Sequence, residues 1–124
     1  MIEIQEKTLA EQLVDLLNKT GLRFAEDSWE NKAPDNYGVV EVTGEETGEW
    51  ADGHMIDESF TAVITIYVTG NSARWVDRIQ RILEAIDAGY SMPERKYLPD
   101  IKKVSWKWKA NLYSPIEWPE AVEV

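Results

Sequence analysis

The sequence contains no cysteine and only one histidine, His54. Without cysteine there can be no disulfides, thiol catalysis or cysteine metal sites, which fits a reducing compartment without proving one. The sequence has no G-x-S-x-G motif and no glycine-rich phosphate loop. Nucleophilic catalysis needs a nucleophile beside a base. We therefore expect no enzyme, no catalytic residue and no cofactor.

Long apolar runs are missing, and basic residues are few. No stretch reaches the roughly 18 apolar residues of a membrane-spanning helix. The acidic first six residues lack the apolar region of a signal peptide. The chain has 13 basic and 23 acidic residues, for a formal net charge of -10. Such a chain repels phosphate, so we expect neither nucleic acid nor an anionic membrane as a general partner.

The length and composition are those of one globular domain. The chain has 124 residues, of which 44% are hydrophobic and 29% charged. Residues 1–113 are expected to form this domain. Residues 114–124 contain Pro115 and Pro119 and are expected to form a C-terminal tail.

Two segments have the apolar spacing of helices. Residues 8–19 place leucines on one face, with Thr8 as N-cap, Glu11 completing a capping box and Gly21 as the stop. Residues 73–88 carry a second apolar stripe, and Gly89 is expected to end that helix.

Alternating or β-prone residues predict strands at 22–26, 37–42, 58–68 and 101–113. Residues 90–99 contain Pro93 and Pro99 and are expected to be irregular. The predicted fold is α+β: a single two-layer domain with a mostly antiparallel sheet of about four strands and two helices packed on one face. The expected core comprises Phe60, Ile64, Ile66, Val76, Ile79, Leu83, Trp106 and Trp108.

Charge is segregated along the chain. No lysine or arginine occurs between Lys32 and Arg74, and residues 41–58 carry seven acids; residues 95–109 carry six basic residues and one acid, Asp100. One interpretation is solubility with an internal match between acidic loop and basic strand. The other is self-assembly, in which the acidic part of one copy meets the basic part of the next.

Residues 43–57 are glycine-rich, acidic and without a clear period, so they form either an exposed loop or a long hairpin tip. Within them His54 lies near Asp52, Asp57 and Glu58, which in principle could bind a divalent ion. The spacing matches no known metal motif, so we favour a solvated loop and expect no metal site.

The six tryptophans divide into two groups. Trp106 and Trp108 are in phase with the apolar face of their strand, and Trp75 begins a helix, so all three are expected to be packed. Large apolar side chains in a loop or tail either fold back onto the domain or anchor a partner. Trp29, Trp50 and Trp118 lie in such segments. Together with residues of the charged segments they are the interface candidates: Trp29, Glu45, Glu46, Glu49, Trp50, Lys103, Lys107, Lys109 and Trp118.

The order of elements resembles that of bacteriophage tail-completion and tail-terminator (head-tail joining) proteins. The resemblance covers about residues 8–113 and lies in short pieces: T-G-L-R-F-A at 20–25, P-D-N-Y-G-V-V at 34–40, A-D-G-H at 51–54, A-V-I-T-I-Y-V at 62–68, and the Ile79 to Leu83 pattern. Each of these short segments is common in α+β proteins. The C-terminal segment from residue 114 departs from the family's pattern.

The resemblance implies a structural assembly protein that self-associates into a ring, commonly a hexamer, between the tail tube and the head connector. It would be made in the bacterial cytoplasm and located in the tail or neck of the virion, where it would cap tube growth and leave a channel for DNA. The alternative is an acidic inhibitor or DNA mimic that occupies a basic groove of a partner. An undetected enzyme is the third hypothesis.

Overall fold

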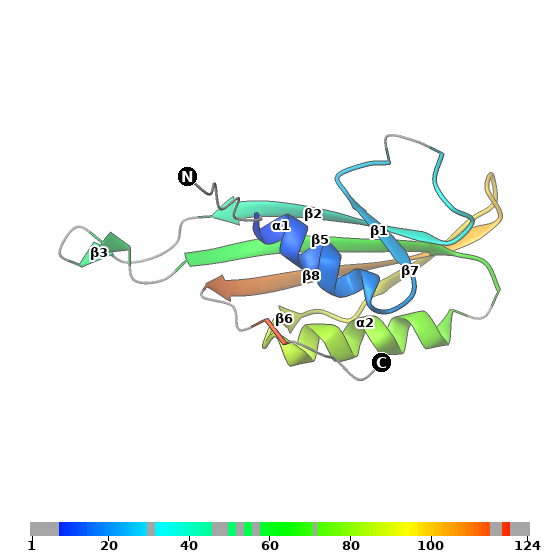
Figure 1. The fold of residues 1–124 in the computed structure, drawn as a ribbon. Helices are drawn as coiled ribbons and strands as arrows, with labels where there is room; N and C mark the ends of the chain where they lie inside the picture. Colours follow the sequence, from blue (N-terminus) through cyan, green and yellow to red (C-terminus); the bar gives the residue numbers. More distant parts are fainter. Residues whose placement is uncertain are drawn as a thin grey trace.

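The computed structural model describes residues 8–29, 32–45, 50–51, 54–55, 58–70, 72–114 and 118–119 (Figure 1). Helix α1 spans Leu9–Asn18 and is capped as its sequence predicts. The backbone N–H of Glu11 donates to the Thr8 hydroxyl oxygen at 3.2 Å. The Glu11 carboxylate accepts a hydrogen bond from that hydroxyl, also at 3.2 Å, so the cap closes through side chains. After the helix, Gly21 takes a positive φ of 95°, which glycine adopts at little cost.

Six strands form the main sheet, in the order β1-β2-β5-β8-β6, with β7 also pairing with β8. Their bounds are β1 Arg23–Glu26, β2 Tyr37–Glu45, β5 Glu58–Val68, β6 Gly89–Tyr90, β7 Glu94–Leu98 and β8 Lys103–Ser114. The β1–β2 pair is parallel, and the other pairs are antiparallel. The α+β class is confirmed, but the sheet is mixed and has more strands than the four or so expected.

The additional strands lie in residues 90–99, where an irregular segment was expected. That expectation was wrong because the two prolines delimit a strand: Pro93 precedes β7 and Pro99 follows it. Both β6 and β7 pair with β8, along the edge of β8 that does not pair with β5. Proline is compatible with such edge positions, since no ladder hydrogen bond is lost there.

Thr43, Gly44 and Glu45, expected in a loop or hairpin tip, belong to β2, which pairs antiparallel with β5 as far as Glu45 and Ser59. Residues 46–49, 52–53 and 56–57 of the segment that follows lie outside the described residues. Within it, β3 (Trp50–Ala51) and β4 (His54–Met55) form a small two-stranded sheet. The acidic segment therefore connects β2 to β5.

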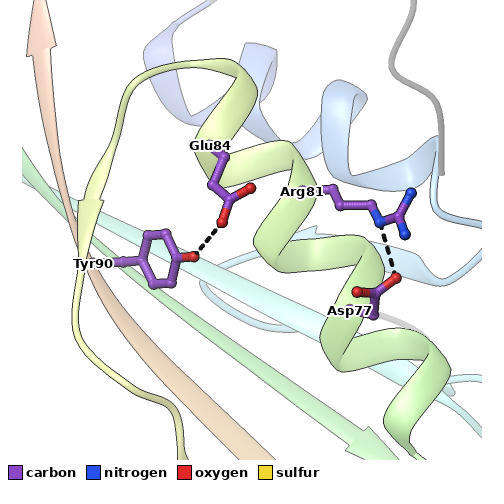
Figure 2. Close-up of polar contacts among 4 residues, drawn as sticks. All are labelled: Asp77, Arg81, Glu84 and Tyr90. Carbon is purple, nitrogen blue, oxygen red and sulfur yellow. Dashed lines mark hydrogen bonds and ion pairs between the residues drawn. The ribbon is translucent and has the colours of Figure 1, made fainter.

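Helix α2 spans Ala73–Ala85, shorter than expected. Its end is not set by Gly89, which belongs to β6. Instead Asp87 takes a positive φ of 55°, and the Ala88 N–H donates to the Leu83 carbonyl at 3.0 Å. Figure 2 shows how β6 is attached to this helix: the Tyr90 hydroxyl donates to Glu84 at 2.9 Å, while Arg81 and Asp77 form an ion pair on the helix surface. The hydrogen bond to Glu84 raises the pKa of Tyr90.

One buried cluster joins both helices to a single face of the sheet, which we call the helix-covered face. Its fully buried members include Leu13 and Leu17 from α1 and Ile79 and Leu83 from α2. The helix-covered face itself consists of Val40, Ala62, Ile64, Ile66, Val68, Trp108, Ala110 and Leu112. The expected core is confirmed, with Phe60, Val76 and Trp106 partly buried against it. Neither described helix is long and apolar enough to cross a membrane.

Candidate interaction face

The opposite face of the sheet, which we call the open face, follows from strict alternation along the strands. On β5, Thr61, Val63, Thr65 and Tyr67 are only half-buried, whereas each intervening residue is fully buried. The strand register places β2 and β8 side chains beside them. The open face comprises Tyr37, Val39, Glu41, Thr61, Val63, Thr65, Tyr67, Ser105, Lys107, Lys109, Asn111 and Tyr113.

An aromatic cluster occupies one end of the open face. Tyr37 and Tyr67 are register partners, and their rings stack with centroids 4.9 Å apart. The rings of Trp29 and Tyr37 meet in a T-shaped arrangement with centroids 6.1 Å apart. The Trp29 indole N–H donates to the Gly38 carbonyl at 3.3 Å. The Lys103 ammonium lies 5.0 Å from the centre of the Tyr37 ring. Two residues predicted separately as interface candidates, Trp29 and Lys103, therefore converge on one tyrosine.

The aromatic cluster forms one wall of an open pocket of about 310 Å³. Val39, Val63 and Thr65 of the sheet line it, together with residues of the segment after β1. The complete lining is Asp27, Ser28, Trp29, Ala33, Tyr37, Val39, Glu41, Val63, Thr65 and Tyr67. The lining thus combines apolar side chains, three aromatic rings and two carboxylates.

Burial in this pocket raises the pKa of Tyr67, and the nearby Tyr37 and Glu41 raise it further. All three causes act against the negative phenolate form. Tyr67 therefore stays protonated at neutral pH and keeps its hydroxyl as a donor.

A basic row crosses the other half of the open face. Lys107 and Lys109 are exposed on β8, opposite Thr65 and Val63 of β5. Lys96 is exposed on β7 opposite Ser105. Among the described residues, Lys107 and Lys109 make no ion pair or hydrogen bond. They lie on the outward face of β8, as predicted, and Lys107 is the register partner of Glu94, an exposed acid on β7.

The remaining interface candidates lie elsewhere. Glu45 lies at the end of β2 opposite Ser59, and Trp50 lies in β3 opposite Met55. Glu46 and Glu49 are outside the described residues. Trp118 is half-buried against the core and lines a shallow pocket beside α1 with Leu16 and Pro119, so it folds back onto the domain away from the open face.

Sequence reasoning missed Tyr37, Tyr67 and Glu41 as members of a site. Each lies at an outward position of a predicted strand, which is a usable signal. Their convergence depends on the β2–β5 register, however, and no local pattern specifies that register. His54 lies in β4, and the part of the chain that the structure describes holds no group of three His, Cys, Asp or Glu residues able to bind a metal.

Comparison with known proteins adds no assignment. No protein-family model and no curated protein matches the chain.

Proposed function

We propose that this chain is a structural assembly protein of a phage or prophage tail, which acts by binding and not by catalysis. Copies would associate into a ring, commonly a hexamer, that joins the tail to the head connector. The observation that supports self-association most directly is the open sheet face, where Lys107 and Lys109 make no ion pair within the part of the chain that the structure describes. Its half-buried aromatic side chains are suited to a protein partner, since aromatic residues are enriched at interfaces.

Charge segregation supports a head-to-tail contact between copies. Residues 46–57, which we propose form a hairpin tip, and the lysines of β8 are different parts of the same chain, so one could meet the other on a neighbouring copy. A contact between two different surfaces is heterologous, and heterologous contacts close into rings when the rotation permits. The resemblance of the order of elements to that of tail-terminator proteins supports the proposal of a ring at the end of a phage tail.

The experiment is to neutralise the acids of the tip with Glu45→Gln, Glu46→Gln and Glu49→Gln together. A control triple of equal charge change, Glu26→Gln with Asp35→Asn and Asp100→Asn, uses exposed acids elsewhere. Assembly is measured by sedimentation, and phage infectivity is measured in parallel. We expect the tip triple to weaken assembly and infectivity, and the control to leave both unchanged.

Salt dependence distinguishes the possible contacts. If the tip contacts the lysine face, added salt weakens assembly because it screens opposite charges. If the tips of neighbouring copies mainly repel one another, added salt strengthens assembly. A chain that stays monomeric and binds a basic partner with steep salt dependence would instead be the acidic inhibitor or DNA mimic. If neither assembly nor infectivity changes in the tip triple, the acidic segment is only a solvated connection.

A further inference from the structure

We propose that β7 is a pairing edge, at which a second copy of this chain adds its own β7 in antiparallel orientation around a two-fold axis. The contact would join the sheets of two copies into one continuous sheet. It goes beyond the proposed ring and does not rest on it, because the contact is made by a sheet edge and not by the open face.

Strand β7 is an edge strand whose outer side is open within the described part of the chain. It pairs there with β8 alone, and four of its five residues are exposed. An edge strand presents a row of unpaired backbone N–H and C=O groups, with which another strand can pair. The edge strand on the other side of the sheet, β1, differs: its Phe24 N–H already donates to the Asn18 side chain at 2.8 Å. Of the two edges, β7 is therefore the one that can accept a strand.

Exposed apolar side chains gather along the same edge. The described residues include four large apolar side chains that are exposed, and three of them, Met92, Tyr97 and Ile101, lie in β7 or within three residues of it. Met92 is 82% exposed and Tyr97 is 54% exposed. Apolar side chains that are grouped on a surface, unlike single ones, are typical of an interaction site. The edge thus offers both backbone groups and apolar surface to a partner.

The sequence of β7 selects a second copy as this partner, because it is complementary to itself in one register. Directly opposed residues of antiparallel strands point to the same face of the sheet, so the two-fold axis must pass between one residue and its own copy. With the axis at Arg95, Glu94 of each copy lies opposite Lys96 of the other. With the axis at Glu94 or at Lys96, that residue meets its own like charge and no opposite charges pair. With the axis at Tyr97, Lys96 faces Leu98 and its charge is unpaired.

The charges on the neighbouring strand agree with the register around Arg95. Within its own sheet Glu94 is the register partner of Lys107, and Lys96 is the register partner of Ser105. Glu94 would therefore lie between two lysines, and Lys96 between a serine and a glutamate. Neither Glu94 nor Lys96 forms an ion pair with another described residue of its own chain. Both charges would gain an opposite partner in the dimer.

The two copies of Arg95 are the one like-charge contact at this axis. The guanidinium lies 6.0 Å from the centre of the Trp106 ring of its own chain, a contact that stabilises the cation without the second copy. Farther from the axis, Met92 of each copy comes opposite Leu98 of the other. The dimer therefore covers Met92, the most exposed of the large apolar side chains described above.

A single added strand makes a small interface, so the dimer should be weak. Interfaces below about 1,200 Å² belong to transient complexes, and each cross-strand ion pair contributes little. We therefore expect the dimer at the high protein concentrations of NMR and not at the dilute concentrations of sedimentation.

The test is NMR of the full-length chain, with labelled methionine methyl groups and backbone amides. We expect the signals of the Met92 methyl group and of the β7 amides to shift as the protein concentration rises. All variants are made in a background that removes the proposed ring contact, so that head-to-tail assembly does not mask the dimer. If the ring proposal is wrong, this background changes nothing and the test still holds. The background carries Glu45→Gln, Glu46→Gln and Glu49→Gln.

Two charge reversals test the pairing itself. Lys96→Glu should weaken the dimer about tenfold, because Glu94 then faces a glutamate on both sides of the axis. Since Ser105 is its register partner, Lys96→Glu creates no like-charge pair across to β8. Glu94→Lys should weaken the dimer to a similar extent. Lys32→Glu, which changes an exposed lysine outside β7, is the control of equal charge change and should leave the dimer intact.

Mixing the two variants tests the register. Lys96→Glu and Glu94→Lys chains should dimerise poorly alone and together recover the shifts, because the glutamates of one then face the lysines of the other. A chain with both changes should dimerise as the parent does. Signals of β7 that do not change with concentration, or a Lys96→Glu chain that dimerises like the parent, would overturn the proposal. Single variants that do not recover on mixing would overturn the register around Arg95. Shifts confined to Tyr37 and Tyr67 would place the contact on the open face and also overturn the proposal.

Discussion

The two faces of this sheet are built from the same strands, and neighbouring residues belong to opposite environments. Ile64 is completely buried between α1, α2 and the sheet, whereas Val63 and Thr65 beside it are partly exposed. The helix-covered face is apolar throughout, while the open face combines aromatic rings, carboxylates and lysines. The difference suggests a division: the helix-covered face stabilises the fold, and under the proposal above the open face binds a partner.

This separation predicts that substitutions on the helix-covered face change folding and that substitutions on the open face change binding. Burial of apolar side chains is the dominant favourable term in folding. Exposed charged side chains contribute little to stability, typically within about 0.5 kcal/mol. The following predictions test whether the two faces differ in this way.

The largest expected effect is that of Ile64→Ala. Removing a fully buried isoleucine side chain should lower the free energy of unfolding by about 2–5 kcal/mol, because transfer and cavity terms add. Val63→Ala, one residue away on the open face, should cost less than about 1.5 kcal/mol. Chemical denaturation of both variants measures the difference. Equal costs would show that the two faces are not distinct in burial.

A second substitution tests close packing on the helix-covered side. A Cβ at Gly38 would overlap the ring of Phe24, its register partner on β1. Gly38→Ala should therefore destabilise the fold by about 1–3 kcal/mol, as overpacked sites do. Gly89→Ala is the control, because a Cβ there meets no atom within 4 Å. If Gly38→Ala unfolds at the same denaturant concentration as Gly89→Ala, β1 does not pack as described.

The open face predicts a pH effect through Tyr67. Because its pKa is raised in the folded chain, the folded state holds the phenolic proton more tightly than the unfolded chain does. Its contribution to stability is therefore complete below the ordinary tyrosine pKa of 10.0 and is lost as the pH rises through the folded value. Tyr67→Phe should show a smaller alkaline loss of melting temperature than the parent chain.

The control for that experiment is Tyr113→Phe, which removes an exposed hydroxyl from the same face. Ultraviolet titration of phenolate formation gives an independent measurement. If Tyr67→Phe and the parent chain lose melting temperature in parallel at alkaline pH, Tyr67 is not desolvated in the folded chain.

The smallest expected effect is at the only histidine. His54→Ala should leave the melting temperature unchanged, with or without a chelator, because no metal is expected to bind the acidic tip. A large drop in melting temperature on adding chelator to the parent chain would contradict this. It would also make the tip a third region with its own contribution to stability.

Much of the helix-covered face could be predicted from the sequence, because its buried apolar residues recur at a regular spacing along each strand and helix. The alternation around Ile64 and around Trp108 identifies the inward residues without any structure. Strand β7 was missed because two prolines in a short segment predict irregular structure when the partner strand β8 is not known. The pocket was missed because Tyr37 and Tyr67 are distant in sequence and meet only through register.

The measurement that tests self-association through the open face most directly is a charge exchange. One variant carries Lys107→Glu and Lys109→Glu, a second carries Glu45→Lys and Glu46→Lys, and a third carries all four changes. Lys19→Glu, at the C-cap of α1, with Arg74→Glu, in α2, is the control for the first variant. We predict by sedimentation that the parent chain and the control assemble, that each of the first two variants stays monomeric, and that the third assembles again. A parent chain that is monomeric at every concentration and salt, or a first variant that assembles as the parent does, would contradict the account.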